Sequence, residues 1–138
     1  MRRQAIASRY DRAFVDQPAF QPLHVCNNVR HAYHLYVIRL RQDFLRADRD
    51  RIFRALRAEG IGVNVHYLPV YLHPFYQARF PETTGSCPVA EDAYRDILSL
   101  PLFPAMTDSD VEDVIRALLK VINAYALDSR FAATACSG

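Results

Sequence analysis

The segment that most limits the folds open to this chain is the run His31–Leu40, with the sequence HAYHLYVIRL. It is rich in aromatic and β-branched residues, which favour strands. It is also apolar on both of its alternating faces, which is typical of a strand buried in the middle of a sheet. The pattern therefore predicts a central strand, with His34 as a satisfied core histidine and His31 solvated at the strand's edge.

Helical spacing of apolar residues occurs in four other segments. These segments begin at residue 2, after Asp48 or Asp50, at Pro88 and after Thr107. Gly60 suits the left-handed residue that ends the second helix. The sequence TDSD that starts at Thr107 offers a capping box to the last helix, and its acidic residues are explained by the helix dipole rather than by catalysis.

Two further segments predict strands. Apolar and polar residues alternate with a period of two along Ile61–Val70, which predicts a second strand that ends at Pro69. A loop rich in aromatic residues then runs to Pro81, and residues 98–103 predict a short edge strand.

The order of these elements predicts an α+β fold with a small, mostly antiparallel sheet covered by helices. A chain of 138 residues fits one domain with a single core. We expect an N-terminal helix and connecting loop over 1–30, a folded domain over 31–123 and a frayed tail over 124–138.

Composition and charge bear on several functional classes. The net charge is only +2, and many arginines stand beside acidic residues, so we expect no nucleic-acid partner. The apolar runs are too short to cross a bilayer, so we expect no membrane partner. Cys26, Cys87 and Cys136 are odd in number and far apart, which favours free thiols in a reducing cytoplasm.

The common short motifs for phosphate, zinc and serine chemistry do not occur in the sequence. Ser99 and the other serines have no nucleophile turn around them. A cluster of polar rings and amides that suits a small polar ligand is formed by Asn64, His66, Tyr67, Tyr71, His73 and Tyr76. The alternative is that these side chains are satisfied, half-buried residues at a strand end. No cysteine or carboxylate supports a metal site at His66 and His73.

Three blocks of this sequence resemble a known family in their order and spacing. They are HAYHLYVIRL at 31–40, GIGVNVHYLPVYLHPFYQARFP at 60–81 and LSLPLFPAMTDSDVEDVIRALL at 98–119. The chain resembles, over residues 1–123, the DegT/DnrJ/EryC1/StrS family of sugar-nucleotide aminotransferases, which depend on pyridoxal 5′-phosphate (PLP). Within the family it is most similar to enzymes that aminate C4 of UDP-linked 4-keto-6-deoxy hexoses, for surface polysaccharides and nonulosonic acids.

The resemblance implies that this chain corresponds to the C-terminal small domain of such an enzyme. In the family, a large N-terminal domain holds PLP and the Schiff-base lysine, so we expect that domain to be a partner missing from this chain. Lys120 is the only lysine and lies in the last amphipathic helix, where it does not suit that role. The implied contribution is a substrate-binding wall and part of a dimer surface, so we expect a homo-oligomer that is not competent as this chain alone.

The resemblance also implies roles for single residues. His66 and Tyr67 would face the sugar-nucleotide site, and His34 would support this wall from the neighbouring strand. At Tyr71, related enzymes commonly carry a histidine, in the pattern HYxPxH. A phenol is not a proton shuttle near neutral pH, so altered substrate choice and lost function are both open, and His73 could substitute.

Two alternatives to an enzyme domain stay open at this point. One is a non-catalytic module that binds a nucleotide sugar through residues 64–76 or serves dimerisation. The other is an unrelated α+β domain, which a different strand order would favour.

Overall fold

The computed structural model describes residues 2–127. Its elements, in chain order, are α1 (Arg2–Phe14), β1 (Phe20–Pro22), β2 (Tyr36–Leu40), η1 (Gln42–Phe44), α2 (Arg49–Ala58), η2 (Val70–Leu72), α3 (Pro74–Arg79), η3 (Pro81–Thr83), α4 (Pro88–Asp96), β3 (Ile97–Leu100) and α5 (Asp108–Tyr125). The three strands form one antiparallel sheet in the order β1-β2-β3. The predicted α+β class is therefore confirmed.

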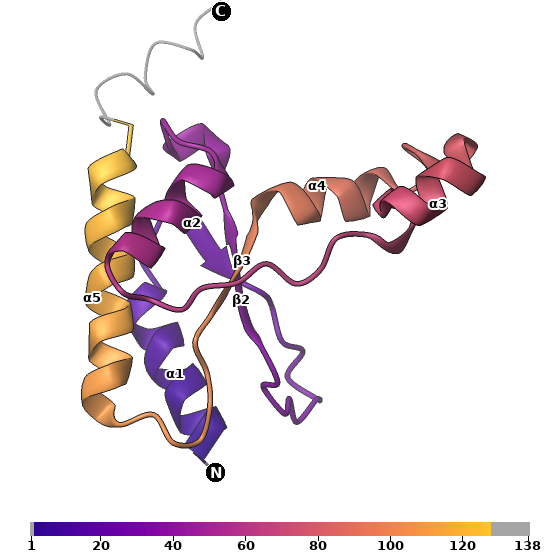
Figure 1. Cartoon of the computed structure of the whole chain (residues 1–138). Coiled ribbons are helices and arrows are strands. Elements are labelled where there is room, and N and C mark those ends of the chain that lie inside the picture. Colours follow the sequence, from indigo (N-terminus) through magenta and orange to yellow (C-terminus); the bar gives the residue numbers. More distant parts are fainter. Residues whose placement is uncertain (1, 128–138) are drawn as a thin grey trace, which may run out of the picture.

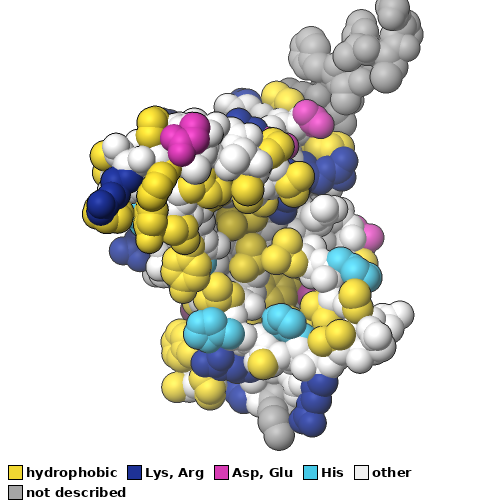
Figure 2. All heavy atoms as spheres, turned by 90° about the vertical axis from the view of Figure 1, so that its right-hand side faces the viewer, with side chains coloured by type: hydrophobic (Ala, Val, Ile, Leu, Met, Phe, Trp, Pro, Cys, Tyr) yellow, Lys and Arg dark blue, Asp and Glu magenta, His cyan; other side chains and the backbone are white. Residues whose placement is uncertain are grey.

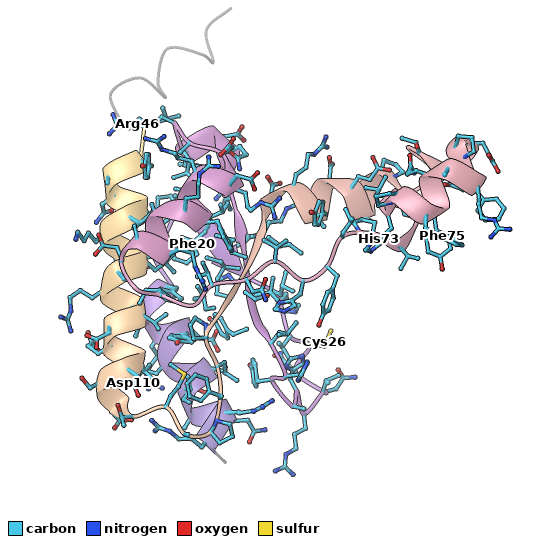
Figure 3. The ribbon with its side chains drawn as sticks, viewed as in Figure 1. Phe20, Cys26, Arg46, His73, Phe75 and Asp110 are labelled. Atoms are coloured by element: carbon cyan, nitrogen blue, oxygen red, sulfur yellow. The ribbon has the colours of Figure 1, made fainter. Side chains whose placement is uncertain are left out.

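The central strand β2 carries the core. Its residues Tyr36, Ile38 and Leu40 are buried and alternate with half-buried ones, so they share one face of the sheet. Helices α1, α2 and α5 lie together on that side of the molecule (Figure 1). Phe20 of β1 lies in the interior between the sheet and these helices (Figure 3). The helix α1 thus belongs to the same hydrophobic core as the residues of the predicted domain.

Two segments project from the side of the molecule away from α5 (Figure 1). One is the connection between β1 and β2, residues 23–35. The other, residues 65–96, we call the arm; it runs out through η2 to α3 and returns through α4 to β3. These two segments shape the face on which the predicted site lies.

The predicted strand over 31–40 is only half correct. Tyr36–Leu40 is the central strand, but residues 31–35 are not extended along the sheet. Tyr33 has φ of 49°, in the left-handed region, which turns the chain away from the sheet. His34 is consequently exposed, so its assignment as a core histidine was wrong, whereas His31 is exposed as expected.

The predicted second strand over Ile61–Val70 is also wrong. Burial alternates with a period of two from Ile61 to Asn64, but only Asn64 pairs with the sheet, in a single bridge to Ser99. The backbone N–H of Val65 then donates to the Asn64 side chain at 2.8 Å, so a local hydrogen bond takes the place of a ladder bond. The alternation in the sequence reflects burial without a regular strand.

Other differences concern short elements. The predicted loop before residue 31 contains β1, and the predicted aromatic loop contains η2 and α3. The last helix runs to Tyr125, two residues into the segment expected as a tail, and residues 128–138 lie outside the described part of the chain. In residues 2–127, no helix is both long enough and apolar enough to span a bilayer.

The helix ends follow the capping signals of the sequence. Asp48 is the N-cap of α2, where its side chain accepts from the N–H of Arg51, and Gly60 has φ of 80° just after that helix. Pro88 occupies the first turn of α4. Thr107 and Asp110 form a complete capping box at α5, and Figure 3 shows Asp110 at this end of the helix.

The capping box predicts a measurable loss of stability in Thr107→Ala. The substitution leaves the N–H of Asp110 without its acceptor, and we expect about 1 kcal/mol less free energy of unfolding in urea. Ser109→Ala is the matched control, since this neighbouring hydroxyl is exposed in the same turn. Equal losses in the two variants would contradict the assignment.

The same box predicts a pH dependence. Hydrogen bonds from the backbone and hydroxyl of Thr107 lower the pKa of Asp110 below its ordinary 3.8. The stability that the ionised Asp110 carboxylate contributes to the fold is therefore present above pH 3.8. It is lost as the pH falls through the lower pKa that Asp110 has in the folded state. We expect Asp110→Asn to be less stable than the wild type at neutral pH, with the difference closing at lower pH.

Candidate functional site

The face that carries the arm and the 23–35 connection holds exposed hydrophobic side chains and histidines. Figure 2 views this face: hydrophobic side chains gather around a central hollow, and histidines lie along its lower part. Large exposed hydrophobic side chains of the arm are Tyr67, Val70, Phe75, Tyr76, Phe80 and Val89, and those of the 23–35 connection are Leu23 and Val29. A hydrophobic face of this extent is typical of a binding surface.

His66 is held against the sheet by Ser99. The Nδ1 atom of His66 lies 2.9 Å from Oγ of Ser99 in β3, and the histidine is half-buried. The backbones of Asn64 and Ser99 exchange two hydrogen bonds, at 2.8 and 3.1 Å. Three contacts thus fix this part of the chain to the edge of the sheet.

Asn64 and Tyr67 flank His66 in different ways. The Asn64 side chain is used by the N–H of Val65. The ring of Tyr67 contacts that of His66 edge to face at 4.6 Å between centroids, and 68% of the Tyr67 surface is exposed. The peptide bond between the two ring residues is cis. His66 and Tyr67 therefore offer neighbouring rings to a ligand.

Tyr71 points into the arm. Its hydroxyl donates to the backbone oxygen of Cys87 and to Oε1 of Glu91, each at 3.2 Å, and the N–H of Gly85 donates to the same Glu91 oxygen at 3.0 Å. Burial and the hydrogen bond to Glu91 raise the pKa of Tyr71 to about 12. Tyr71 therefore fastens η2 to the start of α4 through a phenol that stays protonated at neutral pH.

His73 precedes α3 and is exposed (Figure 3). Its side chain makes no hydrogen bond to the described residues, although it stands at the N-cap position of that helix. Phe75, two residues further along the arm, is 61% exposed beneath the guanidinium of Arg79, which lies 5.3 Å from the ring centroid. His73 is thus available to a ligand, but nothing in the described residues orients it.

His34 lies in a separate part of the face. It lines a concavity of about 940 Å³ formed by Asp11 and residues 22–26 and 29–37. At this concavity the hydroxyl of Tyr36 donates to Oδ1 of Asp11 at 2.6 Å, and burial followed by that hydrogen bond raises the pKa of Tyr36. No described hydrogen bond or ring contact links His34 to residues 64–73, so its supporting role stays a prediction.

The residues for metal or covalent cofactor chemistry are limited. Among residues 2–127, no three His, Cys, Asp or Glu side chains are grouped as metal ligands. Cys26 and Cys87 are free and exposed, and Cys136 lies outside the described residues. The amine of Lys120 is bound to both carboxylate oxygens of Glu59, at 2.8 and 2.9 Å. These groups do not fit covalent attachment of PLP.

Sequence reasoning missed Ser99, which it weighed only as a nucleophile. It is the one buried polar residue among those that the structure describes, with 4% of its surface exposed. The available signal was the sequence Leu98-Ser99-Leu100, in which a hydroxyl interrupts an apolar strand. A buried hydroxyl needs a partner, and His66 is that partner.

Comparison with protein families gives one match over most of the chain. Residues 1–119 match the DegT/DnrJ/EryC1/StrS aminotransferase family. Among curated proteins, the chain is 40% identical over 122 residues to the spore coat polysaccharide biosynthesis protein SpsC of Bacillus subtilis (strain 168). The match covers 88% of this chain and 31% of SpsC.

Solved structures give the same result. PseC of Helicobacter pylori, an aminotransferase involved in the biosynthesis of pseudoaminic acid, matches with a TM-score of 0.81 and 33% identity, over 90% of this chain and 33% of PseC. The PLP form of Spr1654 of Streptococcus pneumoniae, a putative sugar aminotransferase, matches with a TM-score of 0.79 and 31% identity, over 89% of this chain and 31% of Spr1654. The chain thus spans about a third of the length of these relatives.

The contacts of Tyr71 predict the effect of Tyr71→Phe. The pKa of the Tyr71 phenol in the folded state, about 12, lies above the ordinary 10.0. The stability that the protonated phenol contributes is therefore present below pH 10.0 and is lost as the pH rises through about 12. We expect the variant to lose one phenol that ionises near pH 12 in an ultraviolet titration. We also expect faster hydrogen exchange at the start of α4, whose first turn the Tyr71 hydroxyl holds.

Tyr76→Phe is the control, because the Tyr76 hydroxyl makes no hydrogen bond to a described residue of the same arm. An unchanged exchange rate in Tyr71→Phe, or an equal change in Tyr76→Phe, would contradict the fastening role of Tyr71.

Proposed function

Because the chain belongs to the DegT/DnrJ/EryC1/StrS aminotransferase family, we propose that it is the C-terminal small domain of a PLP-dependent sugar-nucleotide aminotransferase. Its proposed part in the reaction is to form one wall of the substrate site and part of an oligomer surface. The reaction of the whole enzyme would convert a keto-sugar nucleotide to an amino sugar. The observation that carries the proposal is the match of nearly the whole chain to one third of sugar aminotransferase structures.

The position of Lys120 supports a division of labour between this chain and another domain. Lys120 is the only lysine of the sequence, it lies on α5, and Glu59 holds its amine. Helix α5 packs on the helical side of the sheet, whereas the arm projects from the other side (Figure 1). We propose that a lysine-bearing N-terminal domain, the missing partner, holds PLP, which supplies the amino-transfer chemistry when it is bound.

This chain would contribute substrate contacts. The rings of His66 and Tyr67 can donate to or accept from hydroxyl and phosphate oxygens of a nucleotide sugar. His73 is exposed further along the arm and can take the role that the phenol of Tyr71 does not, since that phenol is engaged by Glu91. Asn64 and His34 complete the proposed set, Asn64 through the bridge to Ser99 and His34 from the 23–35 connection.

The substrate class is proposed from the relatives. The names of PseC and SpsC refer to pseudoaminic acid and to a spore coat polysaccharide, so a nucleotide sugar for a surface glycan is the proposed substrate. A UDP-linked 4-keto-6-deoxy hexose is the narrower proposal, and a cytoplasmic location stays a prediction. The alternative is a non-catalytic module that binds a nucleotide sugar or serves dimerisation. The enzyme domain and the non-catalytic module are distinguished by whether a partner domain carries the Schiff-base lysine.

The proposal predicts that the chain alone does not hold PLP covalently. After incubation with PLP and gel filtration, we expect no cofactor absorbance in the protein fraction, for the wild type and for Lys120→Ala alike. Lys120 is 66% exposed in an ion pair with Glu59, so it lacks the desolvated pocket that activates a Schiff-base lysine. An absorbance band that the wild type retains and Lys120→Ala loses would contradict the proposal.

The exposed face predicts self-association of the isolated chain. Phe75 and Val89 of the arm are 61% and 80% exposed, and large exposed hydrophobic surfaces usually bind a partner. By light scattering at high concentration, we expect a mass above the 15.8 kDa of one chain. The double variant Phe75→Ser, Val89→Ser should move the mass toward that of the monomer.

Val15→Ser is the control, because Val15 is 75% exposed but lies at the end of α1, away from the arm. A monomeric wild type, or dissociation by Val15→Ser alone, would contradict this use of the arm.

A further inference from the structure

Ser99 occupies an unusual position for a hydroxyl. Its neighbours Leu98 and Leu100 are 0% and 4% exposed and share one face of β3. The Ser99 side chain therefore faces the opposite side of the sheet, where Oγ meets the His66 ring, while Asn64 pairs with Ser99 along the edge of β3. With 4% of its surface exposed, Ser99 is shielded from water nearly as well as these leucines. A hydroxyl buried in this way is costly unless its hydrogen finds an acceptor.

The only acceptor that the described residues offer to this hydroxyl hydrogen is Nδ1 of His66, 2.9 Å from Oγ. If Nδ1 carried the ring proton instead, it would donate to Oγ, and the buried hydroxyl hydrogen would have no acceptor among residues 2–127. The neutral imidazole that satisfies both groups accepts at Nδ1 and carries its proton on Nε2. The serine thus selects one of the two tautomers of His66.

The other edge of the imidazole is left for a ligand. Within residues 2–127, Nε2 of His66 has no hydrogen-bond partner, and the ring is only half-buried. The exposed ring of Tyr67 lies beside it, at 4.6 Å between centroids. The two backbone hydrogen bonds between Asn64 and Ser99 hold the chain two residues before the ring, so the direction of the Nε2–H bond is fixed by the sheet.

We propose that Ser99 is a positioning residue that holds His66 in the Nε2–H tautomer and directs this N–H toward the substrate site. The ligand atom that it fits is an oxygen acceptor, either a sugar hydroxyl or a phosphate oxygen of a nucleotide sugar. The assignment of the tautomer depends only on the contacts of Ser99. The assignment of the ligand depends on the proposed function, in which His66 faces the substrate.

The tautomer is tested by nuclear magnetic resonance of the ¹⁵N-labelled full chain at a pH where the imidazoles are neutral. The ring nitrogens of His66 are assigned by their disappearance in His66→Gln. We expect Nε2 to be protonated and Nδ1 to accept in the wild type, and nuclear Overhauser contacts between the ring and the Ser99 methylene. In Ser99→Ala, His66 should show the same averaged nitrogen shifts as His73, the exposed imidazole of the arm.

Ser99→Thr keeps a hydroxyl at the same place and should restore the wild-type pattern, which a role in packing alone would not do. His73 is the internal control and should not change in any variant. A proton on Nδ1 in the wild type overturns the proposal. Wild-type nitrogen shifts in Ser99→Ala also overturn it.

The ligand contact is tested in the same samples by titration with UDP-N-acetylglucosamine. We expect the Nε2 resonance of His66 to shift, and Ser99→Ala to bind about five- to tenfold more weakly, with binding recovered in Ser99→Thr. Equal affinity in wild type and Ser99→Ala overturns the ligand part of the proposal. If the wild type does not bind the probe, the ligand part of the proposal fails for this chain. The nitrogen shifts still decide the role of Ser99, and the proposed function, in which another domain completes the site, is tested separately.

Discussion

The pairing of β2 with both of its neighbours is the constraint on which the other contacts depend. Tyr36–Leu40 pairs with Phe20–Pro22 on one side and with Ile97–Leu100 on the other, and both pairs are antiparallel. This register places Ile38 opposite Leu98 and Tyr36 opposite Leu100, so their side chains form the buried face under the helices. The opposite face of β3 then carries Ser99, and through it the bridge to Asn64 and the contact with His66. A shift of one residue in β3 would exchange the two faces and remove both the core and the candidate site.

The two sides of the sheet have separate functions in this account. The helical side provides stability, and it also carries Lys120, whose amine is bound by Glu59 at the surface. The other side carries the arm and the 23–35 connection, with exposed rings and with the Nε2 atom of His66, which has no hydrogen-bond partner among residues 2–127. This arrangement is consistent with a chain that matches an aminotransferase family while its single lysine is paired with Glu59 outside the candidate site. The match to about a third of each relative is consistent with that division.

The sequence predicted the helices best, because their ends depend on local contacts. The capping box at Thr107, the cap at Asp48 and the left-handed Gly60 each involve residues within one turn. It predicted strands less well, because pairing depends on distant residues. The three-residue strand β1 ends at a proline and has no pattern of its own, and the left-handed Tyr33 shortens β2 by half of its predicted length. The site followed the same rule: His66 was found from local composition, whereas Ser99, which lies 33 residues away, was not.

The most direct measurement replaces the matching third of PseC by residues 1–123 of this chain and tests the aminotransferase activity of the fusion. The same graft from Spr1654 is the control for the junction, since it has a similar fold and a similar identity to this chain. The account predicts a folded fusion that retains PLP through the lysine of the PseC portion, has aminotransferase activity, and loses activity in His66→Ala. A fusion that folds and retains PLP but is inactive, beside an active Spr1654 graft, would contradict the claim that this chain forms a substrate wall.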